Sequence, residues 1–451
     1  MDAGQHLGRN LVPAAMDEMG MDVVGPGKTM TIRVEDQNLL EAMFRASVAA
    51  ADPLNGIRAH LPKPPAGGRT VVIGAGKGAA QMAAALESLW PEPLTGVVVT
   101  RYGYGCHTRS IKVIEASHPV PDEAGLAAAA ELMQAVRTLT EDDLVIALIC
   151  GGGSALLPAP PAGFALADEV ALNTILLASG APISAMNTIR KHFSEIKGGR
   201  LAAATAARTI SLIVSDIPGD NPAFVASGPT VPDATGRQDA LDLVAQYRLQ
   251  LPAPILAHLR SPAADAPHPE DHRFARNEHH VIASACISLE AAASVAREHG
   301  IQAVILSDSI EGEARDVALV HAAIAREIVM RNRPFERPTV LLSGGETTVT
   351  LQAQGGRGGR NGEFGLALAL ALDGYPVTAL AADTDGIDGS ESNAGVFCDG
   401  TTARRFKASG LDGPSLLSRH DSYTGFQALG DLFVTGPTGT NVNDFRAILI
   451  R

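Results

Sequence analysis

The chain has few aromatic residues and few cysteines. Aromatic side chains make up 4% of the 451 residues, which argues against the base-stacking surfaces of proteins that bind single-stranded nucleic acid. The four cysteines, Cys106, Cys150, Cys286 and Cys398, lie far apart and form no C-x-x-C pair. They predict neither a disulfide framework nor a zinc site, and they suit a reducing cytosol.

The sequence also lacks an excess of positive charge and a long apolar run. Its formal net charge is -13, whereas proteins that bind a phosphate backbone need a dominant basic face. No apolar run nears the roughly 20 residues that span a bilayer, and the N-terminus has no basic start followed by an apolar stretch. We therefore expect a soluble, cytoplasmic protein with no nucleic-acid or membrane partner, which binds any anionic substrate through a local basic cluster.

The pattern that the chain does have is an alternation of apolar strands and helices. The length predicts two or three domains, and the alternation after residue 70 is typical of a doubly wound, mostly parallel sheet. A segment rich in Pro, Asp, His and Arg at 251–278 precedes a second alternation. We predict an N-terminal extension over 1–34, a large α/β domain over 35–272 and a smaller α/β domain over 273–451, with the active site in the cleft between these two domains.

Three of the apolar strands end in glycine turns that carry a polar residue, Lys77, Ser154 or Glu346. Such turns let backbone N–H groups approach an anion at the edge where open α/β sheets bind ligands. For the GGGS turn, an anion-binding nest and a tight turn with an N-cap serine are equal alternatives. The residues that we assign to nucleotide or phosphate binding are Gly74, Gly76, Gly151, Gly152, Gly153, Ser343, Gly344, Gly345, Glu346 and Asn443.

The first of these turns also has the spacing of a dinucleotide fingerprint, in Gly74, Gly76 and Ala79. An NAD-binding enzyme would place an acid at the end of the next strand, but that strand ends in Arg101. Three interpretations stay open here: a turn with a solvated lysine, an NAD(P)H site with Arg101 at a 2′-phosphate, and phosphate binding by Lys77 with a helix N-terminus.

Hydrogen-bond donors are concentrated in the segment 186–202. Asn187, Arg190 or Lys191, Ser194 and Lys197 recur at helical spacing before two glycines. This spacing collects donors on one helix face, which suits a carboxylate or a phosphate, although a basic face is often only solvated. With Ser154, the residues that we assign to substrate binding are Asn187, Arg190 and Lys191.

Carboxylates follow strands in both halves of the chain. Asp216 and Asp220 come after one apolar strand, and Asp385 belongs to the later run DTDGIDG. Carboxylate oxygens suit hard Mg²⁺, but aspartate is also common in ordinary turns. We predict Asp216 and Asp385 as metal ligands. Arg360 lies in a glycine loop that opens a helix, which favours phosphate binding by its guanidinium and the helix dipole together.

The chain resembles the glycerate 2-kinases, which combine a large N-terminal domain with a C-terminal MOFRL domain. The resemblance covers about residues 36–451 and rests on nine motifs in order: IGAGKGA, SHPVPDEAG, CGGGSALL, MNTIRKHFSEIKGGRLA, SDIPGDNP with ASGPT, SGGET, GGRGGRNGE, DTDGIDG and TGPTGTNVND. One departure is Gly362, where the family usually has glutamine.

The resemblance implies phosphorylation of D-glycerate at its 2-hydroxyl by ATP, with Mg²⁺ or another divalent cation. It implies a catalytic lysine at Lys77 and a catalytic arginine at Arg360, and we assign Asp216 or Asp220 to holding the metal or polarising the hydroxyl. Two alternatives are an NAD(P)H-dependent hydroxypyruvate reductase and a non-catalytic metabolite-binding protein. A homodimer is compatible with all three.

Overall fold

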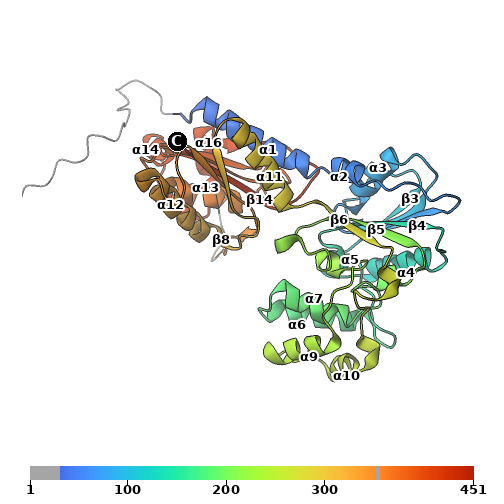
Figure 1. The fold of residues 1–451 in the computed structure, drawn as a ribbon. Helices are drawn as coiled ribbons and strands as arrows, with labels where there is room; N and C mark the ends of the chain where they lie inside the picture. The colour runs from blue at the N-terminus through green and yellow to red at the C-terminus, as the bar shows by residue number, and fades with distance from the viewer. Residues whose placement is uncertain (1–30, 352–355) are drawn as a thin grey trace, which may run out of the picture. The chain divides into compact units, whose positions relative to one another are not determined.

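The computed structural model describes residues 31–351 and 356–451, so nearly all of the predicted N-terminal extension lies outside the described residues. Two six-stranded sheets organise this part of the chain (Figure 1). Helices cover both faces of each sheet.

The first sheet is parallel throughout, in the order β3-β2-β1-β4-β5-β6. Its strands are β1 (Thr70–Ala75), β2 (Thr95–Arg101), β3 (Ile111–Ala116), β4 (Leu144–Cys150), β5 (Arg208–Val214) and β6 (Glu278–Ala283). The central strands β1 and β4 are buried along their whole length, as near-continuous apolar runs in a parallel sheet should be. The predicted parallel sheet is confirmed.

Each face of the first sheet packs against its own helices. On one face, α4 (Glu123–Arg137) and α5 (Gly153–Leu156) share a core with β1 and β4. On the other face, α2 (Pro53–Ala59) and α3 (Ala79–Leu89) pack with the same strands. The small residues of α3 and α4, mostly alanine, let both helices lie close to the strands.

A separate cluster of helices is formed by the segments of the sequence that connect β4 to β5 and β5 to β6. Its core joins α6 (Leu166–Ala178), α7 (Ile183–Lys191), α9 (Arg237–Gln246) and α10 (Ala253–Arg260). Shorter helices in this stretch are α8 (Arg200–Ala203) and the 3₁₀ turns η1 (Pro218–Asp220), η2 (Val225–Ser227), η3 (Pro262–Ala264) and η4 (His272–Phe274).

The second sheet is mixed, in the order β13-β12-β11-β14-β9-β7. Only β7 and β9 run parallel, and the other neighbours are antiparallel. Its strands are β7 (Gln302–Ser307), β9 (Thr339–Ser343), β11 (Val377–Asp383), β12 (Gly395–Asp399), β13 (Leu432–Phe433) and β14 (Asp444–Ile450). A parallel pair of short strands, β8 (Gly312–Glu313) and β10 (Thr347–Thr348), forms a third sheet.

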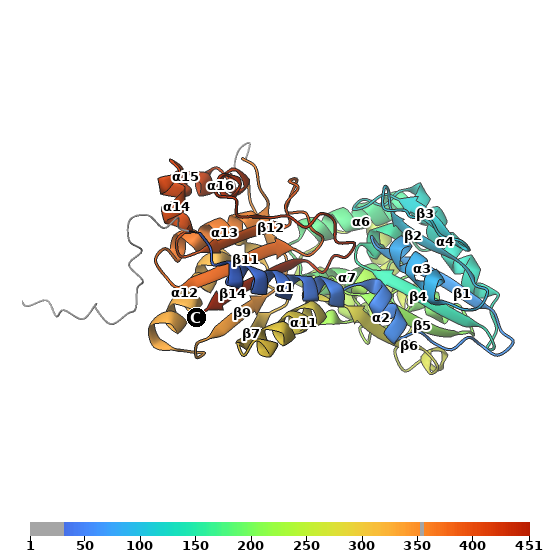
Figure 2. The ribbon, with the colours of Figure 1, turned by 90° about the horizontal axis from the view of Figure 1, so that it is seen from above.

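The first helix of the chain packs on this second sheet. Figure 2 shows α1 (Val34–Ala50) beside α11 (Ala285–Glu298), and both share a core with β9, β11 and β14. On the opposite face lie α12 (Ala314–Arg331) and α13 (Arg360–Ala371), with α14 (Thr402–Ala408), α15 (Gly413–Ser418) and α16 (Ser422–Leu429) packed further out.

The packing assigns two elements differently from the predicted boundary at residue 272. Strand β6 follows that boundary and pairs with β5 in the first sheet, and α1 precedes it by far but packs with the second sheet. The domain boundary at residue 272 therefore stays a prediction that rests on the sequence alone. Among the described residues, no helix has the length and apolar character needed to cross a membrane.

Candidate functional site

The strand order of the first sheet creates a point where the connections diverge. From β1 the chain proceeds outward to β2 and β3, and it then returns to β4 on the other side of β1. Open α/β sheets bind their ligands at such a point, beyond the carboxyl ends of the strands. The turns after β1 and β4, which carry Lys77 and Gly151–Gly153, lie at this point.

These two turns are in direct contact. The backbone N–H of Lys77 donates to the carbonyl of Gly151 over 2.9 Å. Gly152 has a φ of +80°, and a Cβ there would lie 3.1 Å from Lys77 Cγ and 3.1 Å from Nε2 of His118. The left-handed backbone favours glycine, and a Cβ at this position would be in tight contact with both side chains. The side chains of Lys77 and His118 thus both lie against Gly152.

Asp216, which follows β5, brings a carboxylate to the same corner. Its oxygens lie against the Cα of Gly151. Burial raises the pKa of Asp216, the nearby charge of Lys77 opposes that rise, and Glu346 adds to it. The side-chain amide of Asn443 donates to the carbonyl of Asp216 over 3.3 Å. The structure therefore brings together the predicted residues Lys77, Asp216, Glu346 and Asn443.

The fingerprint glycines have packing explanations. A Cβ on Gly74 would lie 2.6 Å from the carbonyl oxygen of Leu148, and one on Gly76 would overlap Cys150. Both glycines therefore allow β1 and its turn to lie close to β4. The N–H of Gly78, at the start of α3, donates to the sulfur of Cys150 over 3.2 Å. Donors that a bound pyrophosphate would need at this turn are already paired within the protein.

Arg360 is held by three carboxylates. Its Nε donates to Asp444 over 2.6 Å, its Nη2 to Asp383 over 2.7 Å, and its Nη1 to Glu346 over 3.4 Å. Asp444 and Asp383 are buried, whereas the side chain of Glu346 is 60% exposed. Burial alone would lower the pKa of Arg360, but the carboxylates of Asp444 and Asp383 raise it. The guanidinium is permanently charged and fixed in direction.

The prediction that the N-terminus of α13 binds phosphate together with Arg360 does not fit its contacts. The carboxylate of Asp388 accepts the N–H of Asn361 over 2.9 Å and that of Gly362 over 2.7 Å. Asp388 is 1% exposed, and its burial raises its pKa to about 6. This side chain caps the helix in the position that a phosphate would occupy.

The turn after β9 is also paired internally. The N–H of Gly344 donates to the carbonyl of Ser307, and its carbonyl accepts the N–H of Ile310. The hydroxyl of Ser343 hydrogen-bonds Nε2 of His321 over 2.9 Å. Phosphate binding by Ser343, Gly344 and Gly345 stays a prediction, and Glu346 is the exposed side chain of this turn.

Three of the four predicted substrate-binding residues form one hydrogen-bonded chain. The hydroxyls of Ser154 and Ser227 lie 2.7 Å apart, and Ser227 donates to Oδ1 of Asn187 over 3.0 Å. Arg190 approaches the same oxygen at 3.4 Å and donates through Nε to Asn173 over 2.8 Å. Among the described residues, no carboxylate lies within ion-pair distance of Arg190. The structure thus brings Ser154, Asn187 and Arg190 together.

The fourth, Lys191, is engaged elsewhere. Helix α7 ends at Lys191, so the predicted helix through Lys197 is wrong. The hydroxyl of Ser194 accepts the N–H groups of Ile196 and Lys197, each over 3.2 Å, which folds a turn there. The side chain of Lys191 is 2% exposed and pairs with Asp233. Its contacts are those of a buried structural ion pair, so the prediction that it binds substrate does not fit.

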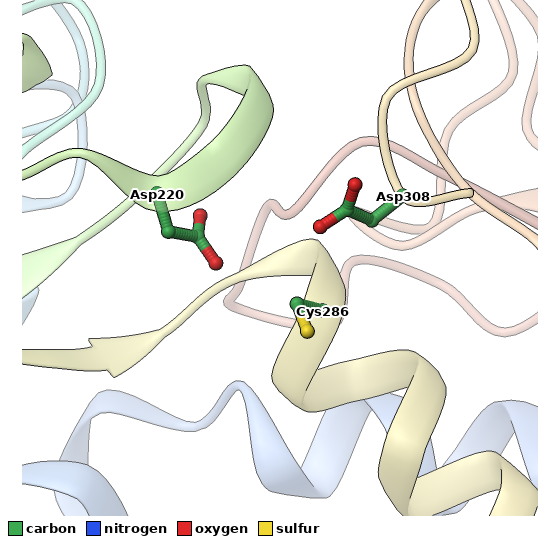
Figure 3. A group of neighbouring side chains, drawn as sticks. All are labelled: Asp220, Cys286 and Asp308. Atoms are coloured by element: carbon green, nitrogen blue, oxygen red, sulfur yellow. The ribbon is translucent and has the colours of Figure 1, made fainter.

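One group of side chains has the spacing of metal ligands. Asp220, Cys286 and Asp308 approach from η1, from α11 and from the loop after β7, with ligand atoms within 4.8 Å of one another (Figure 3). Burial raises the pKa of the Cys286 thiol, and the charges of Asp308 and Asp220 raise it further. The thiol therefore stays protonated, and two carboxylates remain as hard oxygen ligands.

The two predicted metal ligands lie outside this group. Asp216 faces Lys77, and Oδ1 of Asp385 accepts the N–H of Ile387 over 2.8 Å in an ordinary turn. Sequence reasoning missed Ser227 and Asp308. Asp216 was selected as an acid directly after an apolar strand, and the same rule selects Asp308. Ser227 belongs to ASGPT, one of the motifs on which the family resemblance rests.

Known proteins resemble this chain over most of its length. Residues 39–260 match a domain of unknown function, DUF4147, and residues 339–444 match the MOFRL family. A protein of Agrobacterium vitis named "Putative hydroxypyruvate reductase" is 53% identical over 85% of this chain and 100% of its own length. The glycerate 2-kinase of Pyrococcus horikoshii is 42% identical over 83% of this chain and 86% of its own. The crystal structure of glycerate kinase from Thermotoga maritima superposes with a TM-score of 0.82 at 36% identity, covering 92% of this chain and 100% of that one.

Proposed function

The chain belongs to the glycerate kinase family that combines a DUF4147 domain with a MOFRL domain, and we propose that it transfers a phosphoryl group from ATP to the 2-hydroxyl of D-glycerate with the help of a divalent cation. Membership confirms the resemblance found in the ordered sequence motifs. The names of the relatives divide between kinase and reductase, so the choice between these activities rests on the geometry of the site.

The observation that carries the proposal is a string of charged side chains that begins at the carboxyl ends of the first sheet, with Lys77 and Asp216, and continues to Glu346 after β9 and Arg360 at the start of α13. Lys77 lies beside Asp216, the charge of Glu346 reaches Asp216, and Glu346 pairs with Arg360. Phosphoryl transfer needs mainly positioning and neutralisation of negative charge. Lys77 and Arg360 are cations that Asp216 and Glu346 link, and a phosphate can take the place of these carboxylates. The two cations then position the phosphate and neutralise its charge.

Arg360 is suited to contact the transferring phosphoryl group. Asp383 and Asp444 hold two of its three nitrogens in buried pairs, while Glu346 holds the third at 3.4 Å from an exposed position. A phosphoryl oxygen replaces Glu346 at Nη1 without disturbing the other two contacts. Lys77 neutralises charge from the opposite end of the string.

Arg190 is suited to bind the carboxylate of glycerate. It is half-buried and lacks a carboxylate partner among the described residues, and its Nη1 and Nε are directed by Asn187 and Asn173. A planar guanidinium binds a carboxylate with two parallel hydrogen bonds. The chain of hydroxyls from Asn187 to Ser154 leads from this cation to the turn beside Lys77.

Asp220 and Asp308 are suited to hold the cation. Their oxygens face one another across a short gap, and Mg²⁺ typically takes one or two carboxylates together with waters and substrate phosphates. A cation bound there supplies neutralisation of the phosphate charge. Asp216, the other carboxylate considered for this cation, lies near Lys77 instead.

The reductase alternative fits the same region less well. The first sheet has the strand order of dinucleotide-binding folds, but Gly76 is packed on Cys150 and the N–H of Gly78 is paired with its sulfur. Arg101, the residue that the sequence suggested for a 2′-phosphate contact, lies over the ring of Tyr104 at 4.8 Å. These contacts favour phosphate handling by Lys77 over pyrophosphate binding at the turn.

A paired assay tests the proposal. The purified protein is given D-glycerate, ATP and Mg²⁺ in one arm, and hydroxypyruvate with NADH or NADPH in the other, with the Lys77→Ala variant in both arms to detect contaminating enzymes. We expect ADP only in the first arm, only with glycerate, and only before chelation of the metal. Phosphorus NMR should identify 2-phosphoglycerate and not 3-phosphoglycerate. Oxidation of the nicotinamide without ADP would establish the reductase, and silence in both arms would favour a binding protein.

A further inference from the structure

His118 lies at the same corner of the site as Lys77. It follows β3, whose carboxyl end lies at the same edge of the parallel sheet as those of β1 and β4. Its Nε2 lies 3.1 Å from the position of a Gly152 Cβ, and Cε of Lys77 lies 3.2 Å from that position. The imidazole and the lysine side chain therefore share one glycine as their contact surface.

We propose that the imidazole of His118 is the base that accepts the proton of the glycerate 2-hydroxyl as that oxygen attacks the γ-phosphorus. This inference rests on the proposed kinase function and adds a catalytic residue to it. Neither ring nitrogen of His118 pairs with any of the described residues, although the side chain is half-buried. A polar ring that is directed at a phosphate-binding turn and lacks a protein partner is available to a substrate.

The surroundings keep the ring neutral. Burial lowers the pKa of His118 below its ordinary value, and the charges of Lys77 and Arg101 lower it further. Lys77 comes from the turn after β1, and Arg101 is the last residue of β2. The turn after β4 presents the uncharged Gly152, and the carboxylate of Asp216 lies beyond it against Gly151. At pH 7 the ring thus has a free nitrogen lone pair, which a base requires.

The step balances without a further reactant. The O–H bond of the substrate breaks and its proton moves to His118, while the oxygen forms a bond to the γ-phosphorus. The bond between that phosphorus and the β-phosphate oxygen breaks, and ADP leaves with the electron pair. Lys77 offsets the charge on the phosphoryl oxygens, and His118 then returns its proton to solvent.

The experiment compares His118→Gln with His107→Gln. His107 is exposed in the loop between β2 and β3, so its variant controls for a change in the same region. General bases contribute about 10²- to 10⁴-fold to turnover, so we expect H118Q to lose kcat by about that factor with little change in the KM for glycerate. H107Q should keep the wild-type kcat, and matched melting temperatures should show that all three proteins are folded.

The pH profile separates a base from a structural residue. With His118 as the base, wild-type kcat/KM falls as the pH decreases through the pKa of His118, below 6.5, and H118Q loses this acid limb. If H118Q keeps both the turnover and the limb of H107Q, the inference is wrong while the kinase function stands. If the limb disappears in Asp216→Asn and persists in H118Q, the base is Asp216 and the inference is again wrong. A wild-type protein that forms no ADP from glycerate would overturn the function and this inference together.

Discussion

Replacing Arg360 by methionine should cost stability as well as turnover, because the guanidinium is a partner of buried carboxylates. The variant removes the contacts to Asp444 and Asp383, whose side chains are 0% and 6% exposed. Asp444 keeps Arg446, Asn361 and Thr347 as partners. Within the described residues, the carboxylate of Asp383 keeps only one hydrogen bond, from the backbone N–H of Asp385. The cost therefore falls mainly on Asp383.

The magnitude follows from the general cost of removing one partner from a buried ion pair. That cost is about 3 to 5 kcal/mol, and the lower end applies here because Arg360 is 25% exposed. Arg357 provides the matched control from the same loop. Its side chain is 53% exposed and pairs with Glu391, so Arg357→Met should cost less than about 1 kcal/mol.

The free energies of unfolding are measured by urea denaturation for the wild type, R360M, R357M, Asp383→Asn and the double variant R360M/D383N. Because asparagine carries no charge that needs a partner, we expect D383N to recover about 0.5 to 3 kcal/mol when added to R360M. Two results would refute the reasoning. One is a loss in R360M no greater than in R357M, and the other is a double variant whose loss equals the sum of the two single losses.

Three further outcomes are expected. Lys77→Ala should lower glycerate-dependent ADP formation by about 10²-fold or more, as removal of a preorganised charge does, while an unchanged melting temperature shows an intact fold; near-normal turnover would leave Lys77 as a solvated side chain. Lys197→Met leaves Glu169, its buried partner at 2.6 Å, without a counter-charge and should cost about 3 to 5 kcal/mol in urea, against less than about 1 kcal/mol for the exposed control Lys112→Met; equal losses would contradict this. The pKa of Asp388 is raised to about 6 in the folded protein. The stability that its protonation contributes is therefore present near pH 4 and is lost as the pH rises through 6. Over that window the wild type should lose stability relative to Asp388→Asn, and a constant difference would be evidence against the raised pKa.

The sequence predicted most of the regular elements because their signals are local. Apolar runs such as 70–75 and 144–150 are strands in the structure, and the alanine-rich segment after the first of them is helix α3. The prediction of one helix over 187–197 was wrong for a local reason that the spacing of the residues does not reveal. Its spacing is helical, but the Ser194 hydroxyl stabilises a turn after the helix has ended.

The candidate site could be predicted only in part. Lys77, Asp216, Glu346 and Arg360 were selected by their positions after apolar strands or in glycine loops, and the structure connects them. The partners that decide which groups are free come from distant parts of the chain. Asp233 neutralises Lys191 from 42 residues away, and Asp388 caps α13 from 26 residues beyond Gly362. No spacing rule reports such pairs. The homodimer and the cytoplasmic location stay predictions.

The position of α1 has a consequence for how the chain is made. Its buried side chains Leu40, Met43 and Phe44 find their partners on α11 and on β14, and Asp36 pairs with Arg451, 415 residues later. At about 5 to 20 residues per second, a ribosome needs roughly 20 to 80 seconds to complete that stretch. During this time the apolar face of α1 has emerged while its packing surface does not yet exist. We expect the first sheet to assemble first during synthesis, and the second to wait until β14 has left the ribosome, with α1 shielded by a chaperone in the interval.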